Sequence, residues 1–266
     1  MRRALIFFLL IACTVPLSLK AMGASAQDNK GSRAYNWYCT KAKRGEQPHL
    51  PSEFSFIGSY SGYYVDEGAD TRGDKVIYLT FDCGYENGNV EKILDILKKH
   101  NAKSAFFILG NLVRRNTDLV KRMCSDGHLV CNHTASHKNM TRVSGFDEFR
   151  DELKSLEELM LEYCGERPAP YYRPPEGSFN EDNLKWASEL GYSTVFWSCA
   201  YDDWDNNRQM PPQKAMDKLM SRLHNGEVLL LHPTSSTNAE ILDGFLTSLE
   251  KMGYRFGTLD ELVCKD

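Results

Sequence analysis

The sequence has 266 residues, of which 42% are hydrophobic and 26% are charged, as is ordinary for a globular protein. It carries 32 basic and 36 acidic side chains, a net charge of −4, which argues against sequence-independent binding of nucleic acid. The length allows one large domain or two small ones.

Residues 1–26 predict a signal peptide. Two arginines precede an apolar run over residues 4–19, which is too short and too interrupted by a proline to span a bilayer comfortably. Small residues up to Ala26 fit a cleavage site, so we expect an exported protein with no stable membrane span after processing. Its 32 basic side chains less three would leave 29 against 36 acidic ones, a net charge of −7. Lipid anchoring at Cys13, which ends a lipobox-like sequence, is the less favoured alternative.

Cysteine usage predicts neither a disulfide framework nor a zinc ribbon. Eight cysteines are present, and cleavage would remove Cys13 and leave an odd number of them. No pair has the C-x-x-C spacing that is typical of a zinc ribbon.

Residues 27–74 predict an ordered extension that packs on the main domain. The segment is irregular and contains Pro48 and Pro51. Its aromatic residues are Tyr35, Trp37, Tyr38, Phe54, Phe56, Tyr60, Tyr63 and Tyr64. A disordered linker would be poor in such side chains.

Residues 75–266 predict a single α/β domain in which strands and helices alternate. The expected strands cover residues 76–81, 104–109, 128–131, 171–173, 193–198, 228–231 and 254–256. The expected helices cover residues 89–100, 116–125, 147–163, 181–190, 212–224, 239–252 and 259–263. Alternation of this kind indicates a parallel sheet, and seven units in about 190 residues favour a closed, slightly short barrel.

The first strand of this domain ends on a carboxylate. Residues 76–81 form an unbroken run typical of a strand that is buried on both faces, and Asp82 follows directly. In parallel α/β proteins the chemistry takes place at the carboxyl ends of the strands. A simple helix cap is the structural alternative for Asp82.

Four further strands end on residues that suit the same chemistry. His133 and His137 have a spacing that suits two imidazoles on one cation if a helical turn begins there. Arg173, Asp203 and His232 follow three later strands. Each has a structural alternative, such as a surface histidine or a core histidine. The convergence of all five strand ends on one barrel mouth favours a catalytic site.

These residues lie in five ordered motifs that resemble the carbohydrate esterase family 4 polysaccharide deacetylases, also called NodB-homology proteins. The motifs are T-F-D-C-G at 80–84, H-T-A-S-H at 133–137, R-P-P-E-G at 173–177, D-W at 203–204 and L-L-H at 230–232. The resemblance implies a distorted (β/α)7 barrel. The extended first motif and the N-terminal aromatic segment resemble the δ-lactam-biosynthetic de-N-acetylases of spore-forming bacteria, which act on muramic acid in spore cortex peptidoglycan.

The resemblance assigns a role to each motif. It implies that Asp82 is the general base, oriented by Arg173, and that His232 is the general acid, tuned by Asp203. His133 and His137 would hold a divalent metal, with zinc as the favoured ion. The residue types suit amide hydrolysis, which needs an activated water and a proton for the leaving amine.

Two positions depart from the family pattern. Cys83 stands where the family usually has a second aspartate that binds the metal, and it is either a third ligand or a small packing residue. Glu176 stands where some members of the spore branch have an arginine, and its charge would repel the lactyl carboxylate of muramic acid. We expect Glu176 to contribute to substrate binding together with Tyr85 and Trp204.

The sequence therefore predicts an exported, monomeric enzyme that removes acetyl groups from N-acetylmuramic acid in the glycan strands of peptidoglycan. One alternative is a deacetylase of N-acetylglucosamine in peptidoglycan or chito-oligomers. An alternative of another class is an inactive wall-binding protein, suggested by the missing aspartate at Cys83. The complete acid and base set argues against it.

Overall fold

The computed structural model describes residues 32–40 and 42–264. The predicted signal peptide, its cleavage site and Cys13 lie outside these residues. An eight-stranded sheet forms the centre of the described chain. Its strands are β2 (Gly62–Tyr63), β3 (Val76–Cys83), β4 (Ala105–Ile108), β5 (Leu129–Asn132), β6 (Ala169–Tyr172), β8 (Ser193–Val195), β9 (Glu227–Leu231) and β10 (Arg255–Phe256).

The sheet is parallel throughout its strand pairs and curls into a distorted barrel. The strands follow the order β10-β3-β4-β5-β6-β8-β2, and β9 lies off this path and also pairs with β3. A parallel bridge between Cys199 and Leu229 joins the segment after β8 to β9. β4 pairs only with the second half of β3, and β10 pairs with the first two residues of β3. The predicted (β/α)7 architecture is confirmed.

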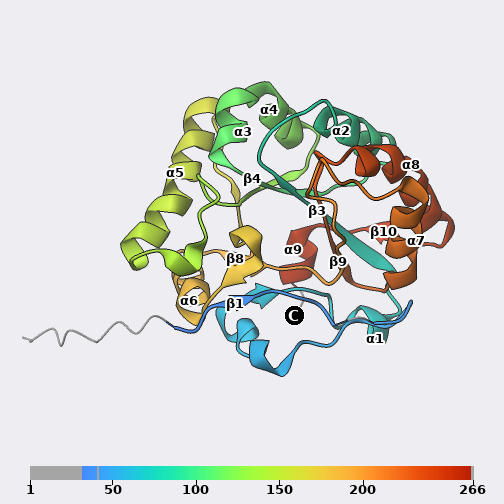
Figure 1. Ribbon diagram of the computed structural model, residues 1–266, viewed down its shortest axis with the longest axis horizontal. Coiled ribbons are helices and arrows are strands. Elements are labelled where there is room, and N and C mark those ends of the chain that lie inside the picture. The colour runs from blue at the N-terminus through green and yellow to red at the C-terminus, as the bar shows by residue number, and fades with distance from the viewer. Residues whose placement is uncertain (1–31, 41, 265–266) are drawn as a thin grey trace, which may run out of the picture. The chain divides into compact units, whose positions relative to one another are not determined.

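Helices cover the outside of the sheet (Figure 1). They are α1 (Ala69–Arg72), α2 (Val90–Lys99), α3 (Gly110–Arg115), α4 (Thr117–Ser125), α5 (Phe146–Cys164), α6 (Glu181–Glu189), α7 (Pro212–Arg222), α8 (Ser236–Lys251) and α9 (Leu259–Val263). No helix in the described part of the chain is long and apolar enough to span a membrane.

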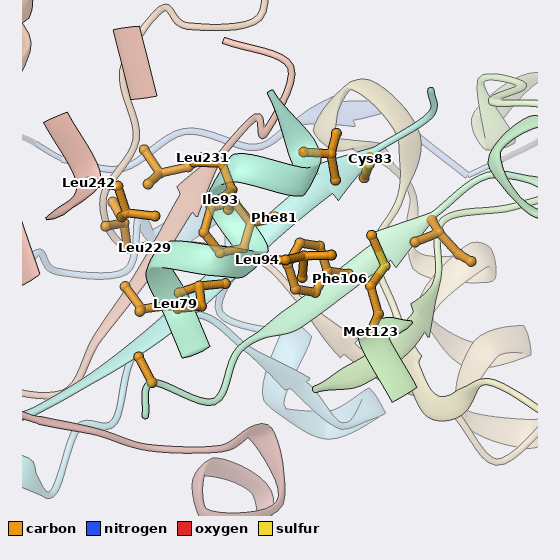
Figure 2. Packing of buried hydrophobic residues seen from close by; sticks show 14 of the residues in the cluster. Leu79, Phe81, Cys83, Ile93, Leu94, Phe106, Met123, Leu229, Leu231 and Leu242 are labelled. Atoms are coloured by element: carbon orange, nitrogen blue, oxygen red, sulfur yellow. The ribbon is translucent and has the colours of Figure 1, made fainter. Parts of the chain in front are cut away.

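Strand β3 has two buried faces, and this explains its continuous apolar sequence. Leu79, Phe81 and Cys83 belong to the cluster that packs under helices α2 and α8 (Figure 2). Tyr78 belongs to the second cluster, which includes residues of β4, β5 and β8. Because side chains alternate along a strand, Asp82 lies on the same face as Tyr78 and opposite Cys83.

The aromatic residues that precede the barrel form a separate cluster with β7 (Ser178–Phe179) and the end of β8. Strand β1 (Tyr35–Asn36) pairs with β7 in antiparallel fashion, and β2 adds in parallel to β8. Trp37 stacks on Phe196 with ring centroids 4.2 Å apart. The segment contains only short helices and strands. Packing of its aromatic rings in this cluster explains why it is rich in aromatic residues.

Candidate active site

Asp82 lies near the carboxyl end of β3, where the strand reaches the mouth of the barrel. Its side chain is only 10% exposed, and its Oδ1 accepts a hydrogen bond of 2.8 Å from Arg173 Nη1. Burial, the largest single effect, would raise the pKa of Asp82, but the charge and hydrogen bond of Arg173 together with the charges of His133 and His232 outweigh burial, and the pKa is lowered. The carboxylate therefore remains ionised at neutral pH.

Arg173 is fully buried, and each part of its guanidinium has a partner. Nε donates to the carbonyl oxygen of Val195 at 2.9 Å, and Nη2 donates to that of Phe196 at 3.1 Å. The guanidinium also lies over the ring of Phe107, 4.1 Å from its centroid. These contacts fix the direction in which Nη1 points at Asp82.

His133 and His137 lie beside this pair on the loop after β5. The two rings are in edge contact with centroids 5.1 Å apart, and His133 Nε2 is 3.6 Å from Asp82 Oδ2. His133 Nδ1 lies 2.8 Å from the carbonyl oxygen of Arg173, to which it donates in the tautomer that leaves Nε2 unprotonated. Burial lowers the pKa of His133 to about 4, so its imidazole is neutral and able to bind a cation.

The histidine spacing suits one cation if a helical turn begins there, and no helical turn forms at this position. Residues 133–139 form a loop in which Thr134 and His137 have φ values of 72° and 60°. Thr134 is β-branched, and such residues rarely adopt the left-handed conformation. The loop can hold this strained shape because neighbouring side chains bind its backbone. The spacing of the two histidines in the sequence could not reveal these contacts.

Asn132 is the buried residue that holds this loop, and sequence reasoning missed it. Its Oδ1 accepts from the backbone of Thr134 at 2.9 Å, while its Nδ2 donates to Leu153 O and Tyr192 Oη at 3.0 Å each. The hydroxyl of Thr134 in turn accepts from the backbone of His137 at 3.0 Å. The sequence does carry a signal for Asn132, because it is a polar residue in an apolar strand, directly before the histidine motif.

His232 follows β9 and forms a pair with Asp203. Its Nδ1 is 2.8 Å from Asp203 Oδ1, and its backbone N–H donates to Asp203 Oδ2 at 2.7 Å. Burial, the largest single effect, would lower the pKa of His232, but the charge and hydrogen bond of Asp203 together with the charge of Asp82 outweigh burial, and the pKa is raised. Asn238, also missed from the sequence, donates to Asp203 Oδ2 at 2.6 Å and so orients the carboxylate.

Glu176 lies on the turn that follows Arg173. The two prolines that follow Arg173 in the sequence precede Glu176, whose backbone has φ 61°. Its side chain is exposed and accepts a hydrogen bond of 2.9 Å from Asn139 Nδ2, on the loop after the histidine pair. The turn therefore places a negative charge beside the histidine loop.

Tyr85 and Trp204 are both exposed aromatic residues on loops that follow site residues. Tyr85 is 45% exposed and Trp204 is 61% exposed, and Tyr85 Oη accepts from Asn206 at 2.5 Å. Their loops are continuous with Asp82 and Asp203 respectively. Exposed aromatic rings next to a polar site offer flat surfaces on which a sugar ring can pack.

Cys83 does not join the histidine pair in this structure. The residue is 1% exposed and belongs to the same buried cluster as Phe81 and Phe106, under helix α2 (Figure 2). Burial raises the pKa of its thiol, which favours the neutral form. In the described residues no three His, Cys, Asp or Glu side chains are grouped so that they could hold a metal. The alternation of side chains along β3 accounts for this, since Asp82 and Cys83 point to opposite faces.

We predict that Cys83→Ser leaves zinc affinity nearly unchanged, because the side chain faces the apolar cluster. The measurement is a zinc titration of the variant beside the parent protein. His137→Ala is the control and should weaken zinc binding strongly. A large loss of affinity in Cys83→Ser would mean that the thiol reaches the metal.

Without Cys83, the imidazoles of His133 and His137 still fit a divalent cation. His133 offers an unprotonated Nε2 in its neutral form, and His137 presents a second imidazole at the exposed end of the loop. The neutral imidazole of His133 and the imidazole of His137 are two donors that zinc and similar ions accept, and water would complete the coordination.

Comparison with known proteins identifies the family. The chain matches the family model "Polysaccharide deacetylase" over residues 69–195. It is 39% identical over 246 residues to the peptidoglycan-N-acetylmuramic acid deacetylase PdaA of Bacillus subtilis, with 92% of each chain covered. The chain belongs to the polysaccharide deacetylase family.

Another relative and two solved structures agree with this family. The structure of Bacillus subtilis PdaA, described as a family 4 carbohydrate esterase, matches with a TM-score of 0.81 at 39% identity and covers 86% of this chain and 96% of that one. A peptidoglycan-N-acetylglucosamine deacetylase of Bacillus cereus is 33% identical over 213 residues, covering 79% of this chain and 74% of that protein. A family 4 pseudoenzyme from Bacillus anthracis matches with a TM-score of 0.67 at 29% identity, covering 76% and 68%.

Proposed function

We propose that this polysaccharide deacetylase removes the acetyl group from N-acetylmuramic acid in peptidoglycan, in the formation of the δ-lactam of spore cortex. The identity of 39% to a muramic acid deacetylase over nearly the whole chain supports this substrate. The observation that carries the chemistry is the pairing of Asp82 with Arg173 beside His133, with His232 and Asp203 at the same barrel mouth.

Asp82 and His232 would carry the two proton transfers. Asp82 accepts a proton from water, the water oxygen bonds to the acetyl carbon, and the carbon–nitrogen bond breaks as His232 donates a proton to nitrogen. The products are acetate and the free amine of the sugar. Arg173 favours the ionised form of Asp82, and Asp203 favours the protonated form of His232, which are the forms that these two steps require.

Other residues would support these steps. His133 and His137 would hold a divalent cation, which supplies Lewis-acid chemistry that makes water more acidic and polarises a carbonyl. The backbone N–H of Glu176 would donate to the oxygen on which negative charge develops. Tyr85 and Trp204 would pack on sugar rings of the glycan strand.

Export fits this substrate, because peptidoglycan lies outside the cytoplasmic membrane. We propose cleavage after Ala26 and release into the wall or spore cortex as a monomer, with lipid anchoring at Cys13 as the alternative.

Activity on N-acetylglucosamine remains the second candidate. The charge of Glu176 would disfavour the lactyl carboxylate of muramic acid, a group that glucosamine lacks, and the Bacillus cereus relative carries the name of a glucosamine deacetylase. An inactive wall-binding protein is the candidate of another class, since a pseudoenzyme occurs among the relatives. A binding protein would have no need for the paired acid and base, so this third candidate is the weakest.

The deciding experiment treats purified spore and vegetative peptidoglycan with the enzyme and identifies the deacetylated sugar by mass spectrometry of the digested strands. We expect free amines on muramic acid. Deacetylation confined to glucosamine would establish the second candidate, and loss of acetate from neither sugar would favour the binding protein.

We predict that Glu176→Gln lowers KM for muramic acid substrates by up to about fivefold, since two like charges 4 Å apart in water repel by about 1 kcal/mol. The variant keeps the size and hydrogen-bonding capacity toward Asn139 but removes the charge. The measurement compares KM for oligomers with a free and with an amidated lactyl group. The amidated substrate is the control and should show no change, whereas equal effects on both would remove the charge explanation.

A further inference from the structure

The segment before the barrel contacts both loops that surround Arg173, although it precedes the residues matched by the family model. Trp37 is 6% exposed. Its indole Nε1 donates to the carbonyl oxygen of Trp197 at 2.9 Å, and its backbone N–H donates to that of Gly177 at 2.8 Å. One residue thus joins the segment after β8 to the turn after β6.

The ring of Trp37 also packs on a residue that binds the guanidinium. It stacks on Phe196 at an interplanar angle of 18°, and the carbonyl oxygen of Phe196 accepts from Arg173 Nη2. The neighbouring carbonyl of Val195 accepts from Arg173 Nε. Since Arg173 is fully buried, water cannot replace these acceptors if the segment 195–197 shifts.

The turn on the other side is packed with little room for adjustment. Gly177 has φ +65°, and a Cβ at this position would come within 2.8 Å of the ring of Trp197 and 3.3 Å of Trp37 Cβ. The ring centroid of Trp197 lies in turn 5.7 Å from Cζ of the Arg173 guanidinium. A displacement of Trp37 would therefore be transmitted to both loops at once.

We propose that Trp37 is a positioning residue for the deacetylation reaction: by joining Trp197 to Gly177 it keeps Arg173 aligned with Asp82. The inference rests on the proposed function, because it takes Asp82 as the base. Trp37 itself touches neither Asp82 nor the histidine pair through any of the contacts described above, so its effect would pass through Arg173. A displacement of about 1 Å in a catalytic group can cost about 10²-fold in rate.

The test compares Trp37→Leu, Trp37→Phe and a control in the same aromatic cluster. We expect kcat to fall by about tenfold to 10²-fold in Trp37→Leu, with KM nearly unchanged. Trp37→Phe keeps the stacked ring but loses the indole N–H, and it should retain an intermediate kcat. Phe54→Leu is the control, because Phe54 is 1% exposed and stacks on Trp37 at 5.2 Å, while its backbone N–H binds Pro51 and not either loop.

A second measurement does not depend on substrate. Hydrogen exchange of the Arg173 Nε–H is followed by NMR, with the resonance identified by its loss in Arg173→Lys. We expect exchange at least about tenfold faster in Trp37→Leu, because the local opening becomes easier, and no change in Phe54→Leu. Thermal unfolding of each variant shows how much stability the substitution removes.

The outcomes separate the positioning role from a general loss of stability. If kcat falls equally in Phe54→Leu and Trp37→Leu at equal melting temperature, Trp37 only stabilises the fold and the proposal is wrong. Unchanged exchange at Arg173 in Trp37→Leu overturns it as well. A parent protein that releases no acetate would refute the proposed function, but the exchange measurement would still decide whether Trp37 holds Arg173.

Discussion

Asp82→Asn is expected to abolish measurable deacetylation and to leave the fold intact. Loss of a general base typically lowers the rate by about 10² to 10⁴, and no other ionised carboxylate is paired with Arg173 in the described residues. Asparagine has the same shape and can still accept a hydrogen bond from Arg173 Nη1, and its substitution opens no apolar cavity. The unpaired Arg173 charge would lower stability by about 3 to 5 kcal/mol at most.

The measurement is acetate release by purified Asp82→Asn, together with circular dichroism to verify the fold. Asp202→Asn is the matched control, because Asp202 is an exposed carboxylate beside the D-W motif and should be dispensable. Near-normal turnover of correctly folded Asp82→Asn would remove Asp82 as the base.

The architecture could be predicted because its strands carry strong local signals. The run that became β3 is buried on both faces, and each later apolar strand is followed by an amphipathic helix or a polar loop. Helix α5 was expected over residues 147–163 and spans Phe146–Cys164. Strand β2 was missed, because two residues that add to the edge of a sheet have no periodicity of their own.

The positions of the candidate site residues could also be predicted, but their supporting contacts could not. Asp82, Arg173 and His232 stand at strand ends, a position that the strand pattern itself gives. The shape of the histidine loop depends on Asn132, whose partners on α5 and at Tyr192 come from distant parts of the chain. Such contacts form only when the barrel closes, so spacing along the sequence could not give the shape of this loop.

His232→Ala is expected to lower kcat by about 10² to 10⁴, the range found when a general acid is lost. The pH profile gives a sharper prediction. His232 must be protonated to donate, and its pKa is raised above the ordinary value of 6.5 because the charge and hydrogen bond of Asp203, together with the charge of Asp82, outweigh burial. In the parent enzyme kcat should therefore fall as pH rises through this raised pKa, and the alanine variant should lose that basic limb.

His100→Ala provides the matched control for the pH profile. His100 also has a raised pKa, since burial is outweighed by its hydrogen bonds to Asp243 and Glu250, but it lies between α2 and α8 and away from the barrel mouth. Its removal should leave the profile unchanged. In His232→Ala the acidic limb should persist, because that limb belongs to the water-activating side of the site. Loss of the acidic limb, with the basic limb retained, would mean that His232 is the base and that the two proton-transfer roles are exchanged.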